Sequence, residues 1–274
     1  MGKILNAYIL PHPPIIVPGI GLGRERKAAK TIEAMKKAAR EIGQDRPTTI
    51  ILSTPHAPTF RDYVYISDTE ELSGSLSKFG RPDINLKFNN NMTLFSLITK
   101  KAKQVGIDAG GLSEQQKIRF NISNELDHGA LVPLYYIAEK LDNFRLVCIS
   151  TPFLPMPVLY DFGKCIQKAV AESGEDVVYI ASGDLSHRLT PDAPIGFSPK
   201  GREYDEALVQ KVKRGDVKGL LGIDESVLEE AGECGTRSIV MMFGALYNKK
   251  FNTEVYSYEG PFGVGYMIAK VNPR

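Results

Sequence analysis

The chain alternates between short apolar runs of strand length and longer segments with helical periodicity. The segments predicted as strands, from their apolar or β-branched composition and bounding turn residues, are 3–10, 48–53, 63–66, 84–88, 145–150, 177–182, 253–258 and 263–271. The segments with helical spacing are 24–42, 92–105, 128–141, 157–171, 201–214 and 234–248. Asp127 or Asn124 is placed to cap the helix predicted from residue 128.

This alternation determines the fold class that we predict. Apolar strands separated by helices are typical of a sheet that helices cover on both faces. We therefore predict one α/β domain of three layers, with a mixed, mostly parallel sheet, over residues 1–274. Residues 68–82 are interpreted as a protruding hairpin or a flexible loop. No shift in composition marks a domain boundary.

Charge and composition narrow the classes of partner. The net charge is only +2, and acidic and basic residues are mixed along the chain, which does not favour nucleic acid. No apolar segment is long enough to cross a bilayer, and residues 1–10 lack the pattern of a signal peptide, so we expect no membrane partner. Three cysteines at unrelated spacings do not form a disulfide framework, and we predict a cytoplasmic protein.

The four histidines are the strongest chemical signal in the chain. His12, His56 and His187 each follow a predicted strand, in the segments Pro-His-Pro-Pro, Pro-His-Ala-Pro and Gly-Asp-Leu-Ser-His. Ligands of open α/β sheets bind beyond the carboxyl ends of the strands, so these histidines are candidates for one site. His128 stands at a predicted helix start, which can lie at the same crevice. A lone histidine after a strand is usually an ordinary loop residue, but four independent accidents explain the pattern less well than one site.

The residues alone leave the metal open. Prolines beside His12 and His56 stiffen their loops, as preorganised metal ligands require. Imidazole suits iron, zinc, copper and nickel. Two histidines with a carboxylate are typical of non-haem Fe(II) oxygen chemistry, whereas three histidines suit hydrolytic zinc.

Acidic and thiol side chains near the predicted helix 234–248 and the last histidine are candidates for a further metal ligand or a supporting group. Glu233 and Cys234 open the predicted helix 234–248, and a helix N-terminus stabilises both a carboxylate and a thiolate. Asp184 precedes His187 in the same turn. It is interpreted either as the group that orients a histidine through its Nδ1 hydrogen or as a turn cap.

Together these motifs resemble a known family. Pro-His-Pro-Pro, Pro-His-Ala-Pro, Asp-His-Gly-Ala-Leu-Val-Pro-Leu and Gly-Asp-Leu-Ser-His, in this order, are similar to the catalytic, LigB-type subunit of class III extradiol ring-cleavage dioxygenases. The segment Glu-Cys-Gly-Thr-Arg-Ser-Ile is more similar to Memo-type proteins, which share that fold. The resemblance extends from Tyr8 to about Tyr266. Each motif is short, but their order and spacing together are fairly specific.

The resemblance implies roles for the histidines. His12 and His56 would bind Fe(II), and His187 would be the acid–base histidine beside bound dioxygen. His128 would contact a metal ligand without binding the metal itself, or would bind substrate. In bacteria such domains are often fused to a second domain, which is compatible with this chain being one domain of a longer protein.

The resemblance also frames the functional hypotheses. The third ligand is a glutamate in ring-cleaving members and a cysteine before glycine in Memo-type proteins, so Glu233 and Cys234 are both predicted metal residues. The first hypothesis is an Fe(II) oxidoreductase of aromatic compound metabolism that opens a catechol-like substrate with O₂. The alternative is Memo-like metal binding without ring cleavage, in redox or radical-linked modification, where a thiolate favours copper or zinc. A zinc hydrolase ranks last, and a homodimer is the expected assembly.

Overall fold

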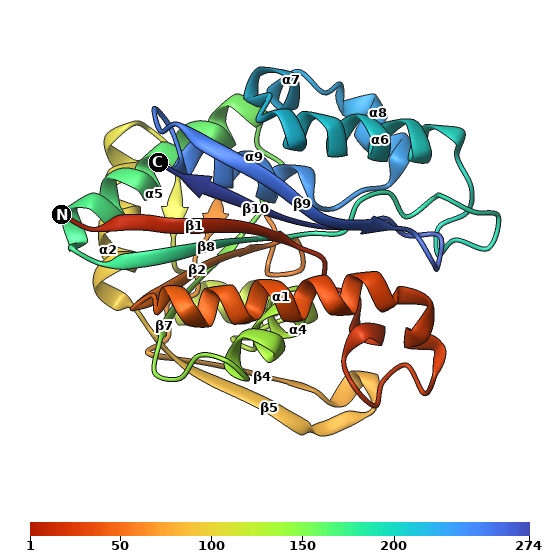
Figure 1. Ribbon diagram of the computed structural model, residues 1–274. Helices are drawn as coiled ribbons and strands as arrows, with labels where there is room; N and C mark the ends of the chain where they lie inside the picture. Colours follow the sequence, from red (N-terminus) through yellow and green to blue (C-terminus); the bar gives the residue numbers. More distant parts are fainter.

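An eight-stranded sheet runs through the middle of the computed structural model, which describes residues 1–274 (Figure 1). The strands of this sheet and of a small two-stranded sheet are β1 (Lys3–Leu10), β2 (Thr49–Thr54), β3 (Val64–Tyr65), β4 (Glu71–Leu76), β5 (Arg81–Asn90), β6 (Ala109–Gly110), β7 (Arg145–Ser150), β8 (Asp176–Ser182), β9 (Phe251–Glu259) and β10 (Tyr266–Pro273). The order in the main sheet is β4-β5-β7-β2-β8-β1-β10-β9. The strands from β5 to β1 in this order pair in parallel, and antiparallel strands close both edges.

Helices cover both faces of the sheet (Figure 1). They are α1 (Ala29–Asp45), α2 (Met92–Gln104), α3 (Glu114–Phe120), α4 (His128–Ala138), α5 (Met156–Ser173), α6 (Pro199–Arg214), α7 (Val217–Leu221), α8 (Glu225–Ala231) and α9 (Thr236–Ala245), with short 3₁₀ helices η1 (Pro14–Ile16), η2 (Arg24–Ala28) and η3 (Ser77–Phe79). α1 and α4 pack on one face, and α2, α5 and α9 pack on the other. None of the helices combines the length and the apolar character needed to cross a membrane.

The pleat of the central strands divides their apolar side chains between two cores. In β1, Tyr8 and Leu10 pack in the core beneath α1 and α4, while Ala7 and Ile9 pack in the core beneath α5 and α9. All residues of β2 are buried. Burial from both sides explains the near-continuous apolar runs in the sequence of these strands. The predicted three-layer α/β domain with a mixed, mostly parallel sheet is confirmed.

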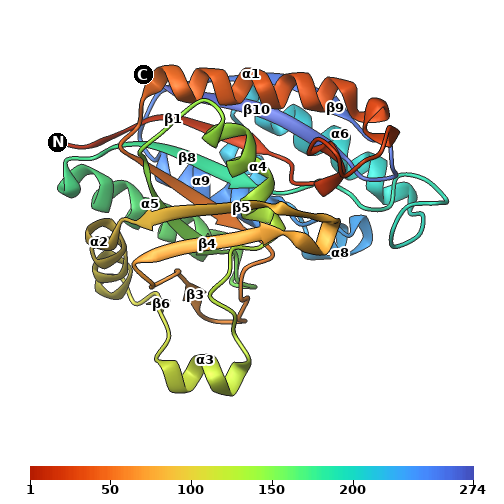
Figure 2. The ribbon, with the colours of Figure 1, turned by 90° about the horizontal axis from the view of Figure 1, so that it is seen from below.

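The structure differs from the sequence prediction mainly in its short elements. Residues 68–82 contain β4, which pairs antiparallel with β5 and joins it through η3, so the hairpin is confirmed and the flexible loop is wrong. The helix predicted at 24–42 begins as the 3₁₀ helix η2 and continues as α1 to Asp45. The sequence prediction lacks α3, α7 and α8 because each is too short to show periodicity. Of these, α3 projects from the body of the molecule (Figure 2).

Candidate metal centre

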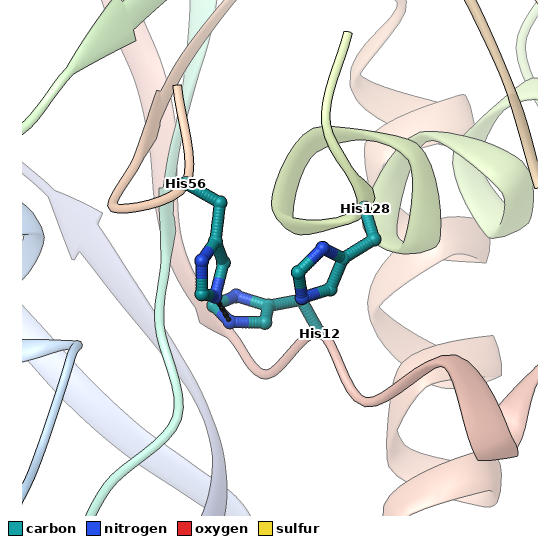
Figure 3. Close-up of side chains that lie close together, drawn as sticks. All are labelled: His12, His56 and His128. Atoms are coloured by element: carbon teal, nitrogen blue, oxygen red, sulfur yellow. Dashed lines mark hydrogen bonds between the residues drawn. The ribbon is translucent and has the colours of Figure 1, made fainter. Parts of the chain in front are cut away.

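Neighbouring strands deliver the first two histidines to one place. β1 and β2 pair in parallel with opposite sides of β8, so their carboxyl ends lie at the same rim of the sheet. His12 follows the end of β1, and His56 follows the end of β2. Figure 3 shows both rings converging with the ring of His128, the first residue of α4.

The three imidazoles lie close enough to share one metal ion. One ring nitrogen from each of His12, His56 and His128 lies within 4.8 Å of the others. The Nε2 atoms of His12 and His56 are 3.0 Å apart, and the ring centroids of His56 and His128 are 4.2 Å apart. His12 is buried, His128 is half-buried and His56 is exposed, so solvent reaches the cluster from the His56 side. Imidazole donors of this kind suit iron, zinc and copper.

Ser182, the last residue of β8, fixes the tautomer of His12. Its hydroxyl donates over 2.5 Å to the carbonyl of Gly129, which can only accept. The same hydroxyl oxygen lies 2.9 Å from His12 Nδ1, so Nδ1 carries the hydrogen and donates it. The lone pair of the neutral ring is therefore on Nε2, the atom that faces His56. Ser182 thus leaves His12 ready to bind a cation through Nε2.

A chain of hydrogen bonds joins the His56 loop to α4. The His56 N–H donates to Thr54 Oγ1 over 3.3 Å, and Thr54 Oγ1 donates to Asp127 Oδ1 over 2.8 Å. Asp127 caps α4 by accepting from the Ala130 N–H, which confirms one of the two predicted caps. Gly129 permits this close approach, because a Cβ there would lie 2.4 Å from Thr54 Oγ1. The position of His128 is thereby coupled to that of His56.

Burial keeps the imidazoles neutral at pH 7. It lowers the pKa of His12 well below the usual value, and it lowers the pKa of His128 to about 4. Partial burial also lowers the pKa of His56, against the opposing effect of the Asp127 charge. Neutral imidazole is the form that binds metal, so the cluster fits a divalent cation without first losing protons.

The loop after β8 packs closely against the start of α9 beside His12. A Cβ at Gly183 would lie 2.2 Å from the Cα of Gly235, so this approach requires glycine. The Asp184 N–H lies 3.2 Å from Cys234 Sγ, and the Cys234 N–H donates to the Asp184 carbonyl. Cys234 Sγ comes within 3.7 Å of His12 Nε2. Burial and the Asp184 charge raise the pKa of Cys234 well above its usual value, so this group is a thiol at pH 7.

Asp184 holds the main chain of the His12 loop. Its Oδ1 accepts from the His12 N–H over 2.9 Å, and burial raises the pKa of the carboxyl to about 7. The interpretation that Asp184 orients a histidine through its Nδ1 hydrogen is wrong for His12, because Ser182 occupies that nitrogen. Asp184 instead fixes the main-chain position of His12.

The structure does not bring Glu233 to the histidines. Its buried carboxylate accepts from the Thr236 N–H over 2.6 Å and from the Tyr204 hydroxyl over 3.1 Å. Arg237 Nη1 lies 3.9 Å from the other carboxylate oxygen. Glu233 therefore accepts a hydrogen bond from an otherwise unpaired N–H in the first turn of α9, where a negative charge is stabilised. Of the two sequence candidates for a third ligand, Cys234 is the one beside His12.

His187 stands at the edge of the cluster. The residue is half-buried, and its main-chain N–H donates to the Ala231 carbonyl over 3.2 Å. Its ring is close enough for a charge on His187 to lower the pKa of His12, and for one on His56 to lower the pKa of His187. Its buried Nδ1 has no hydrogen-bond partner. Burial lowers the pKa of His187, against the opposing effect of the Gly232 and Leu185 main chain, so the ring is neutral at pH 7.

The sequence prediction missed residues that shape the site. Thr54 and Ser182 end apolar strands, and a hydroxyl at the end of a buried strand is a weak signal for them, because Ser150 shares it and bonds to Tyr65 instead. Phe79 has no such signal, because its ring reaches 5.4 Å from the His128 ring only through the tip of the β4–β5 hairpin. Arg81, at the same tip, donates to the Pro18 carbonyl and so ties the hairpin to the loop after β1.

Known proteins are similar to this chain over nearly its whole length. Residues 6–269 match the family described as the catalytic LigB subunit of aromatic ring-opening dioxygenase. Protein CA_C1420 of Clostridium acetobutylicum is 41% identical over 96% of this chain and 56% of its own length, so the chain spans about half of that relative. The 3,4-dihydroxyphenylacetate 2,3-dioxygenase of Escherichia coli is 27% identical over 94% of this chain and 95% of that enzyme.

Two further likenesses are to a MEMO1 family protein and to a solved structure. A MEMO1 family protein of Thermococcus onnurineus is 31% identical over 37% of this chain and 38% of that protein. The crystal structure of the uncharacterized protein JW3007 of Escherichia coli K12 has a TM-score of 0.64 at 13% identity, covering 97% of this chain and 99% of that one. The structural likeness concerns the fold alone. The predicted resemblance to LigB-type and Memo-type proteins is confirmed.

Proposed function

Because the chain belongs to the family of the catalytic LigB subunit of aromatic ring-opening dioxygenases, we propose that it is a metal-dependent oxidoreductase that opens a catecholic ring with O₂. Family membership supports an activity of the ring-cleavage kind. The observation that carries the proposal for this chain is the convergence of His12, His56 and His128, whose ring nitrogens lie within 4.8 Å of one another.

Fe(II) is the metal that we propose, with His12, His56 and His128 as the residues that would hold it. The donor set fits a divalent ion, because burial keeps the rings neutral and Ser182 leaves the His12 Nε2 lone pair free. Family membership, and not the three imidazoles, favours Fe(II) over zinc. A bound divalent ion would polarise the catechol oxygens and lower the pKa of the hydroxyl groups. Three imidazoles also suit zinc and copper, so metal analysis of anaerobically purified protein distinguishes these ions.

The protein's own residues supply positioning and proton transfer. We assign His187 as the residue that accepts a proton from a substrate hydroxyl, at its unpartnered Nδ1, and later returns it. The ring of Phe79 stands beside His128 and offers a face against which a planar aromatic substrate packs. The exposed position of His56 leaves the cluster accessible to a small molecule from solution.

Anaerobic loading with Fe(II) followed by a panel of catechols tests this function. The loaded protein should consume O₂ and form a yellow ring-opened product. His187→Gln should retain the iron and lose about 100-fold or more in kcat, since general acid–base catalysis typically contributes that much. Absence of turnover with every catechol, at full iron occupancy, would refute the proposed activity.

A Memo-like function without ring cleavage is the second candidate, and one distance favours it. Cys234 Sγ lies 3.7 Å from His12 Nε2, whereas the Glu233 carboxylate accepts from the Thr236 N–H at the start of α9. A thiolate ligand would direct the site towards copper or zinc. Because Cys234 is a thiol at pH 7, its ligation must release one proton, whereas three neutral imidazoles release none. Calorimetric zinc titrations in two buffers of different ionisation enthalpy measure the number of protons released on binding. If the thiol binds zinc, Cys234→Ser should abolish this proton release.

The location and assembly of the protein complete the proposal. We propose a cytoplasmic protein, because three cysteines at unrelated spacings suit a reducing compartment. We also propose a homodimer, the commonest state of soluble enzymes. Sedimentation equilibrium of the purified chain tests the assembly.

A further inference from the structure

A buried carboxylate of α6 lies behind the loop that carries His187. Asp205 is fully buried, and burial raises the pKa of its carboxyl to about 7. A carboxylate in such surroundings is costly unless hydrogen bonds compensate for the lost water. Asp205 Oδ1 accepts from the Ser186 N–H over 2.8 Å, and Oδ2 accepts from the Tyr258 hydroxyl over 2.7 Å. Both oxygens are therefore used, and one of them fixes the residue next to His187.

The main chain around His187 is held from several sides. Ser186 Oγ donates to the Ala231 carbonyl over 2.8 Å, and the His187 N–H donates to the same carbonyl. The Gly265 N–H donates to the Ser186 carbonyl over 2.8 Å. The imidazole itself is different, because its Nδ1 has no partner. This loop therefore has a fixed backbone, and the ring lies near the main chain of Leu185 and Gly232 with Nδ1 unpartnered.

Gly265 shows that the fold makes room for the carboxylate. A Cβ at this position would lie 2.0 Å from Asp205 Oδ2. The approach of α6 to the start of β10 therefore depends on the missing side chain. An apolar residue at position 205 would leave the Ser186 N–H without an acceptor, so the carboxylate is matched to the donors of this loop.

We propose that Asp205, with Tyr258, is a positioning pair that holds the Ser186–His187 backbone so that the imidazole faces the histidine cluster. The proposal rests on the proposed function only in giving His187 a role in proton transfer. The geometry of the pair stands without it. Asp205 acts through Ser186 and does not touch the metal residues or a substrate.

The chain offers a matched control for this pair. Tyr256, two residues earlier on β9, donates its hydroxyl to Glu41 of α1 over 2.7 Å, the same kind of bond at the same length. Tyr258→Phe and Tyr256→Phe therefore remove equivalent hydrogen bonds from one strand. Only Tyr258→Phe removes a bond to the carboxylate that contacts the His187 loop.

The experiment follows the histidine resonances by NMR in protein labelled on histidine, where four signals are expected from four histidines. His187→Gln assigns the relevant signal. Asp205→Asn and, more weakly, Tyr258→Phe should shift the His187 signal and its titration midpoint and leave the other three in place. Tyr256→Phe should shift none. In the iron-loaded enzyme, kcat should fall about tenfold in Asp205→Asn with little change in KM, as expected for a displaced proton acceptor.

Two outcomes would overturn the proposal. An unmoved His187 signal in folded Asp205→Asn would show that the carboxylate does not position the ring. Equal shifts of all four signals would show a general structural role. If Asp205→Asn does not fold, Tyr258→Phe alone decides, because it leaves the carboxylate in place. A wild-type enzyme that cleaves no catechol would refute the proposed function, and the NMR result would still decide the role of Asp205.

Discussion

The two sides of the histidine cluster differ in how their side chains reach it. On the strand side, His12 and His56 lie together because β1 and β2 flank β8 and end at the same rim. On the helix side, the start of α9 offers adjacent residues that diverge: Cys234 faces His12, and Glu233 bonds to the Thr236 N–H. Sheet topology thus fixes where a residue after a strand lies. At a helix start, the unsatisfied N–H groups compete with the site for the same side chains.

Removing a histidine from the strand side should have the largest effect. We expect His12→Ala to weaken Fe(II) or Zn(II) binding by more than about 100-fold, beyond the range typical of residues that only support ligands. Competition with a chelator of known affinity measures this loss. His187→Gln is the control and should retain the wild-type affinity. Equal affinities for His12→Ala and the wild type would show that the histidines do not form one centre.

Removing the hydroxyl that prepares His12 should have the next largest effect. Ser182→Ala frees the His12 tautomer, and we expect metal affinity to fall about 10- to 100-fold. Ser150→Ala is the matched control, because Ser150 is also buried at the end of a strand but accepts from the Tyr65 N–H. If the two variants bind metal equally well, Ser182 is only part of the core packing.

Acid should destabilise the metal-free protein through the same histidines. Burial lowers the pKa of His128 to about 4, and an unfolded histidine has a pKa of about 6.5. Between these values the unfolded chain binds a proton that the folded protein does not, so the free energy of unfolding falls as pH decreases from 6.5 to 4. We expect a slope somewhat below ~1.4 kcal/mol per pH unit for this group, because it is partly solvated. Urea titrations of wild type and His128→Gln measure it, and equal slopes would contradict the shift.

Much of the fold and half of the site were predictable from the sequence. The central strands are buried on both faces, so their apolar runs predict them directly, and His12, His56 and His187 follow these strands. Elements of one or two turns, such as α8, have no periodicity to detect.

The remaining features of the site depend on tertiary contacts that no local pattern encodes. Phe79 reaches His128 through the pairing of β4 with β5, and Asp205 reaches Ser186 through the packing of α6 against the sheet. The sequence likewise did not determine whether the Glu233 side chain points to the histidines or to the start of its helix. A carboxylate at a helix start stabilises that helix and can also bind a metal, and the sequence contains both possibilities.

Glu233→Gln is the smallest change and tests the comparison directly. If the carboxylate only satisfies the start of α9, the variant should lose about 1 kcal/mol of unfolding free energy, because a charge-assisted hydrogen bond becomes a neutral one. Its metal dissociation constant should stay within about twofold of the wild type, since the three imidazoles remain. Cys234→Ser, measured in parallel, reports on the side chain that does face His12. A tenfold or greater loss of iron affinity in Glu233→Gln would mean that this carboxylate leaves Thr236 when metal binds. Both sides of the cluster would then supply ligands, and the contrast between strand and helix would hold only for the metal-free protein.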